Sequence, residues 1–485
     1  EKLGESSDIV IREIKLGKEG SVKAGIIYTD GLTDIKSLQD FITEIKMLDH
    51  PQKTAETNLI NDIKECAMTV GDIQDVSDFN RLFTTLLSGD TILLIDGYSH
   101  GLVIANKHWE ERGVTEPTSQ TLIRGPRDGF SENIRLNTAL VRRRIANPNL
   151  WIETKRIGTY TNTNVAVLYI KGIADEKIVK EVHTRLDRIK IDGILESGYV
   201  EELIEDSTTS PFPTVINTER PDAVAASLLE GKVAIMIDGT PFVLIVPALF
   251  IQFFQSPEDH YQRHFIASLV RILRYFAYGI AMLAPSVFIA LTTFHQEMIP
   301  TALLISLAAQ REGVPFPAFI EALIMEVTFE VLREAGVRMP RSIGPTMSIV
   351  GAFVIGTAAV EAGMITATMV IVVSITAISS FVAPAYDIST AARMLRFILM
   401  ALAASFGLFG ITVGLIAIVL HLCSLRSFGI PYMSPLAPYN AKDQKDALVR
   451  LTRWKMFTRP DLLNDNNPIR QQASSLAKPE PNKNE

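Results

Sequence analysis

The alternation of hydrophobic and polar positions changes character twice along the chain. Residues 1–262 alternate charged stretches of helical period with short runs of β-forming residues. Residues 264–424 are dominated by long apolar runs, and residues 425–485 are polar again. This pattern predicts an α/β soluble N-terminal region with two similar subdomains, followed by an all-α helical transmembrane bundle and a polar tail.

Four apolar segments approach or exceed the length of one membrane crossing, which needs roughly 20 apolar residues of helix. Their many glycine, alanine and serine residues leave flat faces for close helix packing, which favours a packed bundle or an oligomer over a single anchor. The last segment is longer than one crossing requires. The segments are Tyr275–Phe294, Thr346–Ala362, Ile365–Ala383 and Leu395–Cys423.

Basic residues flank the apolar segments and bear on membrane topology. They cluster within residues 263–274, 333–341, 393–396 and 442–459, and the positive-inside rule places all four groups in the cytoplasm. Simple alternation of crossings would nevertheless carry the tail outside. Either the last apolar segment bends back near its glycines, or an earlier segment is re-entrant. The first residues lack a signal peptide, so we expect the N-terminal half in the cytoplasm.

The N-terminal half contains an internal repeat. Ile26–Leu48 resembles Val167–Ile189, and each is typical of a buried strand, a glycine turn and an amphipathic helix. Leu86–Ile104 resembles Leu228–Val246 at nearly the same offset, and each contains an Asp-Gly turn signal between two strands. The repeat predicts two related α/β subdomains.

Four regions follow from these patterns. They are residues 1–160, a cytoplasmic α/β subdomain with a basic linker; residues 161–262, a second cytoplasmic α/β subdomain; residues 263–424, a transmembrane helical domain; and residues 425–485, a polar cytoplasmic tail.

Charge and motif content exclude several classes of function. The chain has 47 Lys and Arg against 54 Asp and Glu, and its net charge of −7 argues against a nucleic-acid partner. Two cysteines in 485 residues exclude a disulfide framework. Phosphate-binding, zinc-protease, paired-cysteine and serine-hydrolase motifs are all missing from the sequence. We therefore expect no enzyme activity, no cofactor and no metal site.

An arginine cluster lies between the two repeats, beside a Gly-Pro turn. Arginines at a turn can bind phosphate or acidic lipid headgroups. They can equally pair with carboxylates of this acidic region or form subunit contacts, which is the interpretation we favour. The candidates are Arg124, Arg127, Arg142 and Arg143, with Arg144 beside them.

Carboxylates within the apolar region form a second candidate site. Glu326, Glu330 and Glu334 recur at every fourth position and share one helix face. The functional interpretation is an acidic vestibule of a cation path. The alternatives are a helix lying in the membrane interface with its glutamates in water, or ordinary pairs of Glu330 with Arg333 and of Glu334 with Arg338.

The segment that ends near Glu361 has small residues on one face. Ile349, Phe353, Val360 and Glu361 lie near one another on that helix surface. In an oligomer this face could line a pore, with Phe353 as a hydrophobic constriction and Glu361 at the mouth. The alternative is that Phe353 contacts lipid or a neighbouring helix.

Several long, ordered motifs carry a resemblance to a known family. Together they resemble the A-subunit family of GerA-type spore germinant receptors, over nearly all of residues 20–440. The motifs are TEPTSQTLIRGPRDGF, EELIEDSTTSPFPTVINTERPDAV, FHQEMIPTALL, REGVPFP, EALIMEVTFEVLREAGVRMP and SFGIPYMSP.

This resemblance implies a multi-pass subunit of a nutrient germinant receptor in the spore inner membrane, with its N-terminal domain cytoplasmic. It implies a transporter-like B subunit and a lipoprotein C subunit as partners, together with membrane lipid. It also implies a ring oligomer, a pentamer, that acts as a nutrient-gated channel for monovalent cations and triggers germination, with Phe353 near the narrow point. The alternative is a non-conducting transducer or scaffold that couples nutrient binding by a partner to later germination steps.

Overall fold

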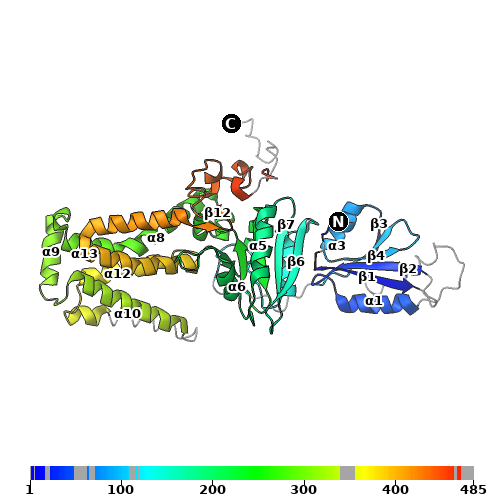
Figure 1. The fold of residues 1–485 in the computed structure, drawn as a ribbon, viewed down its shortest axis with the longest axis horizontal. Helices are drawn as coiled ribbons and strands as arrows, with labels where there is room; N and C mark the ends of the chain where they lie inside the picture. Colours follow the sequence, from blue (N-terminus) through cyan, green and yellow to red (C-terminus); the bar gives the residue numbers. More distant parts are fainter. Residues whose placement is uncertain are drawn as a thin grey trace, which may run out of the picture.

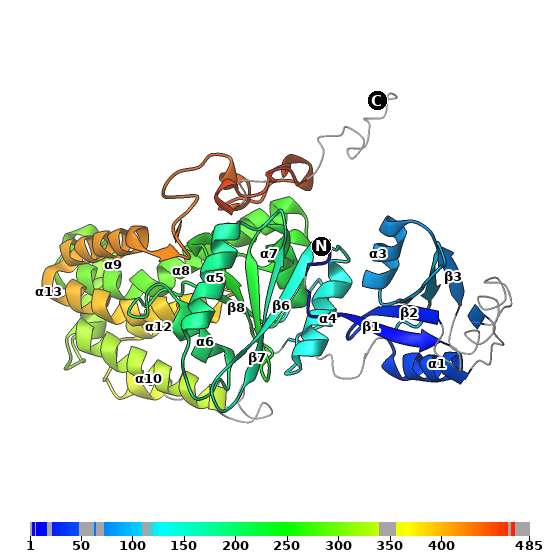
Figure 2. The same cartoon turned by 45° about the vertical axis from the view of Figure 1, so that its right-hand side comes forward.

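A computed structural model shows three parts in a row: a first α/β unit, a second α/β unit and a bundle of helices (Figure 1). The structure describes residues 2–4, 6–16, 22–47, 63–64, 72–108, 116–117, 120–338, 356–463 and 467–470. The second unit lies between the other two parts, so it connects the first unit to the helices (Figures 1 and 2).

The first unit is a five-stranded antiparallel sheet in the order β1-β2-β4-β5-β3. Helix α1 packs on one face through Leu38, Phe41 and Ile45, and helix α3 packs on the other face through Leu86. The alternation of buried side chains along β2 and β4 supplies both faces. The bounds are β1 Ile9–Leu16, β2 Val22–Thr29, α1 Ile35–Met47, β3 Ile73–Val76, α3 Phe79–Leu87, β4 Thr91–Ile95 and β5 Gly101–Ile104.

The second unit repeats this strand order, as β6-β7-β9-β10-β8. Helices α5 and α6 cover one face of the sheet, and α4 and α7 cover the other. The internal repeat of the sequence therefore corresponds to a repeated sheet topology. The bounds are α4 Ile134–Arg144, β6 Leu150–Ile157, β7 Thr163–Ile170, α5 Glu176–Arg188, α6 Ser197–Ile204, β8 Ile216–Thr218, α7 Pro221–Leu229, β9 Val233–Ile237 and β10 Val243–Val246.

The two Asp-Gly signals lie where the repeat places them, between β4 and β5 and between β9 and β10. Gly97 and Gly239 have φ of +87° and +90°, a conformation that glycine adopts without strain. The second sheet begins earlier than the boundary at residue 160, because β6 pairs along its whole length with β7.

The helical part begins after two short 3-10 helices, η1 (Phe250–Phe254) and η2 (Pro257–His260). Its first helix, α8 (His264–Thr293), and its last, α13 (Tyr386–Ser424), are long and apolar enough to cross a membrane. The other elements are η3 Gln296–Met298, α9 Thr301–Arg311, α10 Ala318–Arg338, a helical stretch over residues 356–361, and α12 Ala367–Ser380.

Helix α13 is interrupted at Gly407, where φ is +63° and ψ is −143°. The two halves run back along each other, because a Cβ atom at Gly414 would lie 2.6 Å from Cδ2 of Leu399. Both ends of α13 therefore reach the second unit, where Asp387 and His421 bond to Asn217 and Ser210. The last apolar segment therefore bends back at a glycine, as the first of the two explanations for the topology predicts.

The polarity of α8 is reversed relative to a helix of a water-soluble protein. Phe265, Leu269, Ile272 and Phe276 are exposed along one side, whereas Arg271 and Arg274 are buried against the rest of the chain. A continuous exposed apolar stripe requires an apolar surrounding or a partner. This stripe therefore supports a membrane or subunit environment for the helical part.

The C-terminal segment folds back onto the second unit. Arg459 Nε donates to the carbonyl of Leu229, and Arg470 forms an ion pair with Glu230 at 2.9 Å. Its elements are β11 Arg426–Ser427, β12 Ile430–Pro431 and the 3-10 helices η4 Asp443–Asp446, η5 Arg453–Lys455 and η6 Asp461–Leu463.

Candidate functional site

The predicted acidic row on α10 faces arginines of α13. Glu326 and Arg396 form an ion pair in which both side chains are 0% exposed. Glu330 Oε2 lies 2.6 Å from Nη1 of Arg393, one helical turn away. These two pairs join α10 to α13, so the row lies at a helix contact within the single chain.

The third member of the row behaves differently. Glu334 forms the predicted surface pair with Arg338, at 2.6 Å. Arg333 is not the partner of Glu330; its guanidinium lies 4.9 Å and 5.6 Å from the ring centres of Phe381 and Tyr386. It therefore places a cation against aromatic rings at the end of α12 and the start of α13.

Glu321, one turn before this row, holds the start of α12. Its Oε2 accepts from the backbone N–H of Thr366 at 3.1 Å and from the Thr366 hydroxyl at 3.0 Å. Its other oxygen lies 3.7 Å from Nη2 of Arg311 on α9. One buried carboxylate thus connects three helices.

The predicted pore residues are only partly described. Val360 is half-buried and Glu361 is exposed, at the end of the helical residues 356–361. Ile349 and Phe353 lie outside the described residues. Their roles in a pore stay predictions.

A buried charge network joins the second unit, α8 and the tail. Asp259 accepts from Arg274 at 2.8 Å and from Arg271 at 3.2 Å. Arg271 also pairs with Asp446 at 2.9 Å, and Arg450 donates to the Asp259 carbonyl at 2.8 Å. Arg271, Arg274 and Arg450, which the sequence suggests as charges flanking membrane segments, therefore bind the linker formed by η2 between the second unit and α8.

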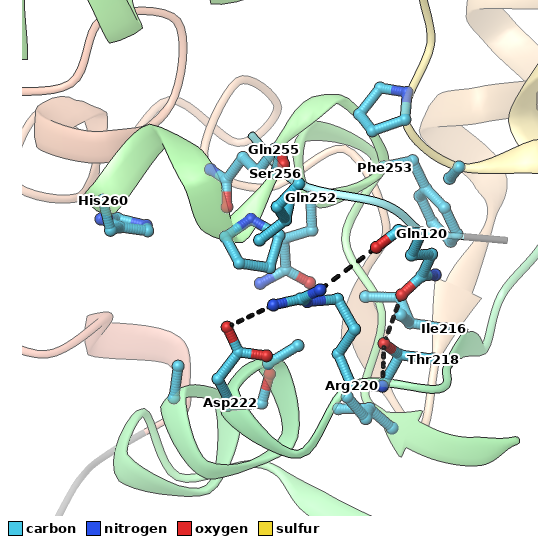
Figure 3. A pocket seen from close by; sticks show the side chains of 18 of the residues that line it. Gln120, Ile216, Thr218, Arg220, Asp222, Gln252, Phe253, Gln255, Ser256 and His260 are labelled. Carbon is cyan, nitrogen blue, oxygen red and sulfur yellow. Dashed lines mark hydrogen bonds and ion pairs between the residues drawn. The ribbon is translucent and has the colours of Figure 1, made fainter. Parts of the chain in front are cut away.

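A pocket with a volume of about 430 Å³ lies beside this network (Figure 3). Arg220 lies in its wall, donating to the carbonyl of Gln120 at 3.2 Å and pairing with Asp222 at 3.0 Å. Asp222 also accepts from the hydroxyl of Tyr261 at 2.6 Å. Residues of η1, η2 and the turn before α13 also line it, so the pocket lies between the second unit and the helical part.

Sequence reasoning did not identify Lys232 and Asp259 as important. Lys232 lines the pocket and directly precedes the wholly buried strand β9. The available signals were the position of Lys232 beside an apolar run and the position of Asp259 just before a helix that carries two arginines. Neither signal is specific without knowing which elements pack together.

A second pocket adjoins the first, shares Phe253 and Pro384 with it, and is acidic. Glu196, Glu201 and Asp387 line it, and Asn217 donates to Asp387 at 2.9 Å. Burial, then the charges of Asp387 and Glu205, raise the pKa of Glu201 to about 7.

Glu201→Gln is expected to stabilise the protein above pH 7. Below about pH 4.5 the carboxyl is protonated in both states, whereas between the two pKa values only the folded state holds the proton. Stability is therefore lost as pH rises from about 4.5 to about 7, and the shift corresponds to about 3 kcal/mol. Melting temperatures of the wild type and variant at pH 5 and pH 8 test this.

The neighbouring exposed Glu202 supplies the matched control. Glu202→Gln should change the melting temperature by the same small amount at both pH values. The prediction would be contradicted if Glu201→Gln raised the melting temperature by the same amount at pH 5 and at pH 8.

The arginine cluster divides into buried and exposed members. Arg142 is 1% exposed, and its guanidinium donates to Asp8, Ser6 and the carbonyls of Asn147 and Leu150, which links the first unit to the second. Arg144 pairs with Asp128 and Arg127 pairs with Glu116, whereas Arg124 and Arg143 are exposed. The donors of Arg142 are thus all engaged within the chain.

Within the described ranges, no group of three or more His, Cys, Asp or Glu side chains has an arrangement that could hold a metal ion. The polar groups of the helical part and the junction are instead paired carboxylates and arginines.

Comparisons with known proteins agree on one family. Residues 1–462 match the family model described as Bacillus/Clostridium GerA spore germination protein. Spore germination protein KA of Bacillus subtilis (strain 168) is 49% identical over 470 residues, covering 97% of this chain and 86% of that protein. Spore germination protein GerLA of Bacillus cereus is 40% identical, covering 96% and 94%.

Two further matches concern the membrane and the soluble region. The B. subtilis protein named uncharacterized membrane protein YfkQ is 46% identical, covering 94% of this chain and 88% of that protein. The crystal structure of the N-terminal domain of the A subunit of the Bacillus megaterium spore germinant receptor GerK3 is 44% identical. It covers 52% of this chain and 92% of that chain, with a TM-score of 0.42.

Proposed function

The chain belongs to the GerA family of spore germination proteins, and we propose that it is the A subunit of a nutrient germinant receptor in the spore inner membrane. The observation that carries the proposal is the family match over residues 1–462. The exposed apolar stripe of α8 and the apolar hairpin of α13 support a multi-pass membrane placement. In this placement both α/β units and the tail face the cytoplasm.

The receptor's other components follow from the family resemblance. A transporter-like B subunit binds the nutrient, and a lipoprotein C subunit completes the complex. The A subunit passes the signal through the contacts that join its second α/β unit to α8 and α13.

We further propose that several copies, a pentamer, form a ring that conducts monovalent cations when nutrient is present. Ile349, Phe353, Val360 and Glu361 line the path in this proposal. The surface exposure of Glu361 and Glu334 is compatible with carboxylates at the mouth. Glu326 and Glu330 are engaged by arginines, so in this conformation they hold helices together.

Purified chain in liposomes with its B and C subunits is expected to give nutrient-dependent K⁺ flux. Phe353→Ala is expected to raise resting K⁺ permeability without nutrient, because removing a hydrophobic constriction lets water and ions enter. Fluorescent K⁺ flux assays on the assembled complex measure both.

Phe276→Ala, on the exposed face of α8, is the matched control and should leave the resting permeability unchanged. Absence of flux from a correctly assembled complex would refute conduction. Equal leaks in the two phenylalanine variants would refute the constriction.

The second candidate function is a non-conducting transducer or scaffold. The buried charge network that joins linker, α8 and tail favours it, because such a network transmits movement without requiring a pore. An assembled complex without a continuous central path, in spores that still germinate, would support this function over the channel.

A further inference from the structure

The junction pocket contains a lysine whose positive charge is not paired. Lys232 is 2% exposed, and its Nζ donates to Oε1 of Gln252. Within residues 120–338 and 356–463, no carboxylate forms an ion pair with it. A lysine is almost never fully buried unless it is paired, because its ammonium loses hydration.

Other charges near the pocket already have partners. Arg220 and Asp222 neutralise each other, and Glu230, which attracts the Lys232 charge, is itself paired with Arg470. Burial, then the charge of Arg453, lowers the pKa of His260 to about 4, so this imidazole is neutral near pH 7. Lys232 therefore carries the uncompensated positive charge of the pocket.

Three further polar atoms of residues in the wall have no hydrogen-bond partner among the described residues. They are Nε of Arg220, a donor, Oδ1 of Asp222, an acceptor, and Nδ1 of His260. Figure 3 shows Arg220 between Asp222 and Gln120 in the centre of the pocket wall. Unpaired buried groups are costly, so these atoms favour a further polar partner in the pocket.

Part of the pocket wall is apolar. It is formed by Ile216, Phe253, Pro384 and Ala385. A volume of about 430 Å³ falls in the range of small-molecule sites, which combine apolar walls with a few placed polar groups.

We propose that this pocket binds a small organic anion whose carboxylate or phosphate oxygens accept hydrogen bonds from Lys232 Nζ and Arg220 Nε. Its apolar part lies against Phe253 and Pro384. Because the walls belong to both the second unit and the turn before α13, the bound anion stabilises their mutual placement. The site is independent of whether the protein conducts ions.

The test measures the melting temperature of the full chain in phosphatidylcholine nanodiscs. Inorganic phosphate or acetate at saturating concentration, compared with chloride at equal ionic strength, should raise it by about 3 °C or more. Lys232→Met, which keeps the length of the side chain but removes its charge, should abolish the rise. Lys180→Met, on the exposed face of α5, should retain it.

Gln252→Glu provides a second variant. Oε1 of Gln252 accepts two hydrogen bonds, from Lys232 Nζ and from the N–H of Leu249, and a carboxylate can accept both. The new carboxylate would pair with Lys232 from within the protein. The variant should therefore melt above the wild type in chloride and should no longer respond to added anion.

A third arm separates a free anion from a lipid headgroup. Nanodiscs containing phosphatidylglycerol should raise the melting temperature without added phosphate if the headgroup is the source, and this rise should be lost in Lys232→Met. A wild type unaffected by phosphate, acetate and phosphatidylglycerol would overturn the proposal. Increases in melting temperature of equal size in the wild type and in Lys232→Met on adding the anion would also overturn the proposal.

Discussion

Arg396→Met is expected to destabilise the folded chain by about 3–5 kcal/mol, because it leaves the fully buried Glu326 without its counter-charge. A buried ion pair adds little to the free energy of unfolding compared with an apolar pair. Removing one partner is nevertheless destabilising, because the other charge stays buried without a counter-charge. The double variant Glu326→Met/Arg396→Met should therefore recover most of the loss. Thermal melting of the wild type and the three variants in nanodiscs measures the coupling.

Arg338→Met is the control for this experiment. Arg338 pairs with Glu334 within α10, the helix that also carries Glu326. The Arg338 side chain is 78% exposed, so the change should lower the free energy of unfolding by less than about 1 kcal/mol. An Arg396→Met variant that melts as high as Arg338→Met would show that Glu326 finds another partner or reaches water.

Asp259→Asn should also cost about 3–5 kcal/mol, since two buried arginines of α8 share this one carboxylate. Asp446 still pairs with Arg271, whereas Arg274 loses the carboxylate whose two oxygens both accept from its guanidinium. We expect a lower melting temperature and faster proteolysis of the segment around Asp446 and Arg450, because the tail is held by the same network.

The adjacent Glu258 provides the control, because its carboxylate accepts from Gln262 and takes no part in the arginine network. Glu258→Gln should stay within about 0.5 kcal/mol of the wild type. Proteolysis of the tail at the wild-type rate in Asp259→Asn would contradict the role given to the network.

The repeat and the helical period were predictable because both are local patterns. The matched glycine turns and strand runs predicted two related α/β units, and both sheets have the same strand order. The periodic placement of Glu326, Glu330 and Glu334 predicted one helix face. Their partners were not predictable, since Arg393 and Arg396 lie more than 60 residues later and only the packing of α13 brings them close.

The break in α13 could be predicted from the sequence only in part. Charge distribution required one reversal among the apolar segments, and glycine content suggested where it could occur. The reversal at Gly407 needs positive φ together with close packing of the returning half on Gly414. The first requirement is visible in a sequence, whereas the second depends on tertiary contacts.

The hairpin of α13 also has a mechanical consequence. The beginning and the end of α13 contact the second α/β unit through Asn217 and Ser210, and the beginning of α8 is held by Asp259 of η2, which follows that unit in the chain. A tilt of that unit therefore applies force to three helix ends at once. At the opposite end of the bundle, Gly407 packs on His295 just after α8, so the far ends of α8 and of the α13 hairpin are joined as well.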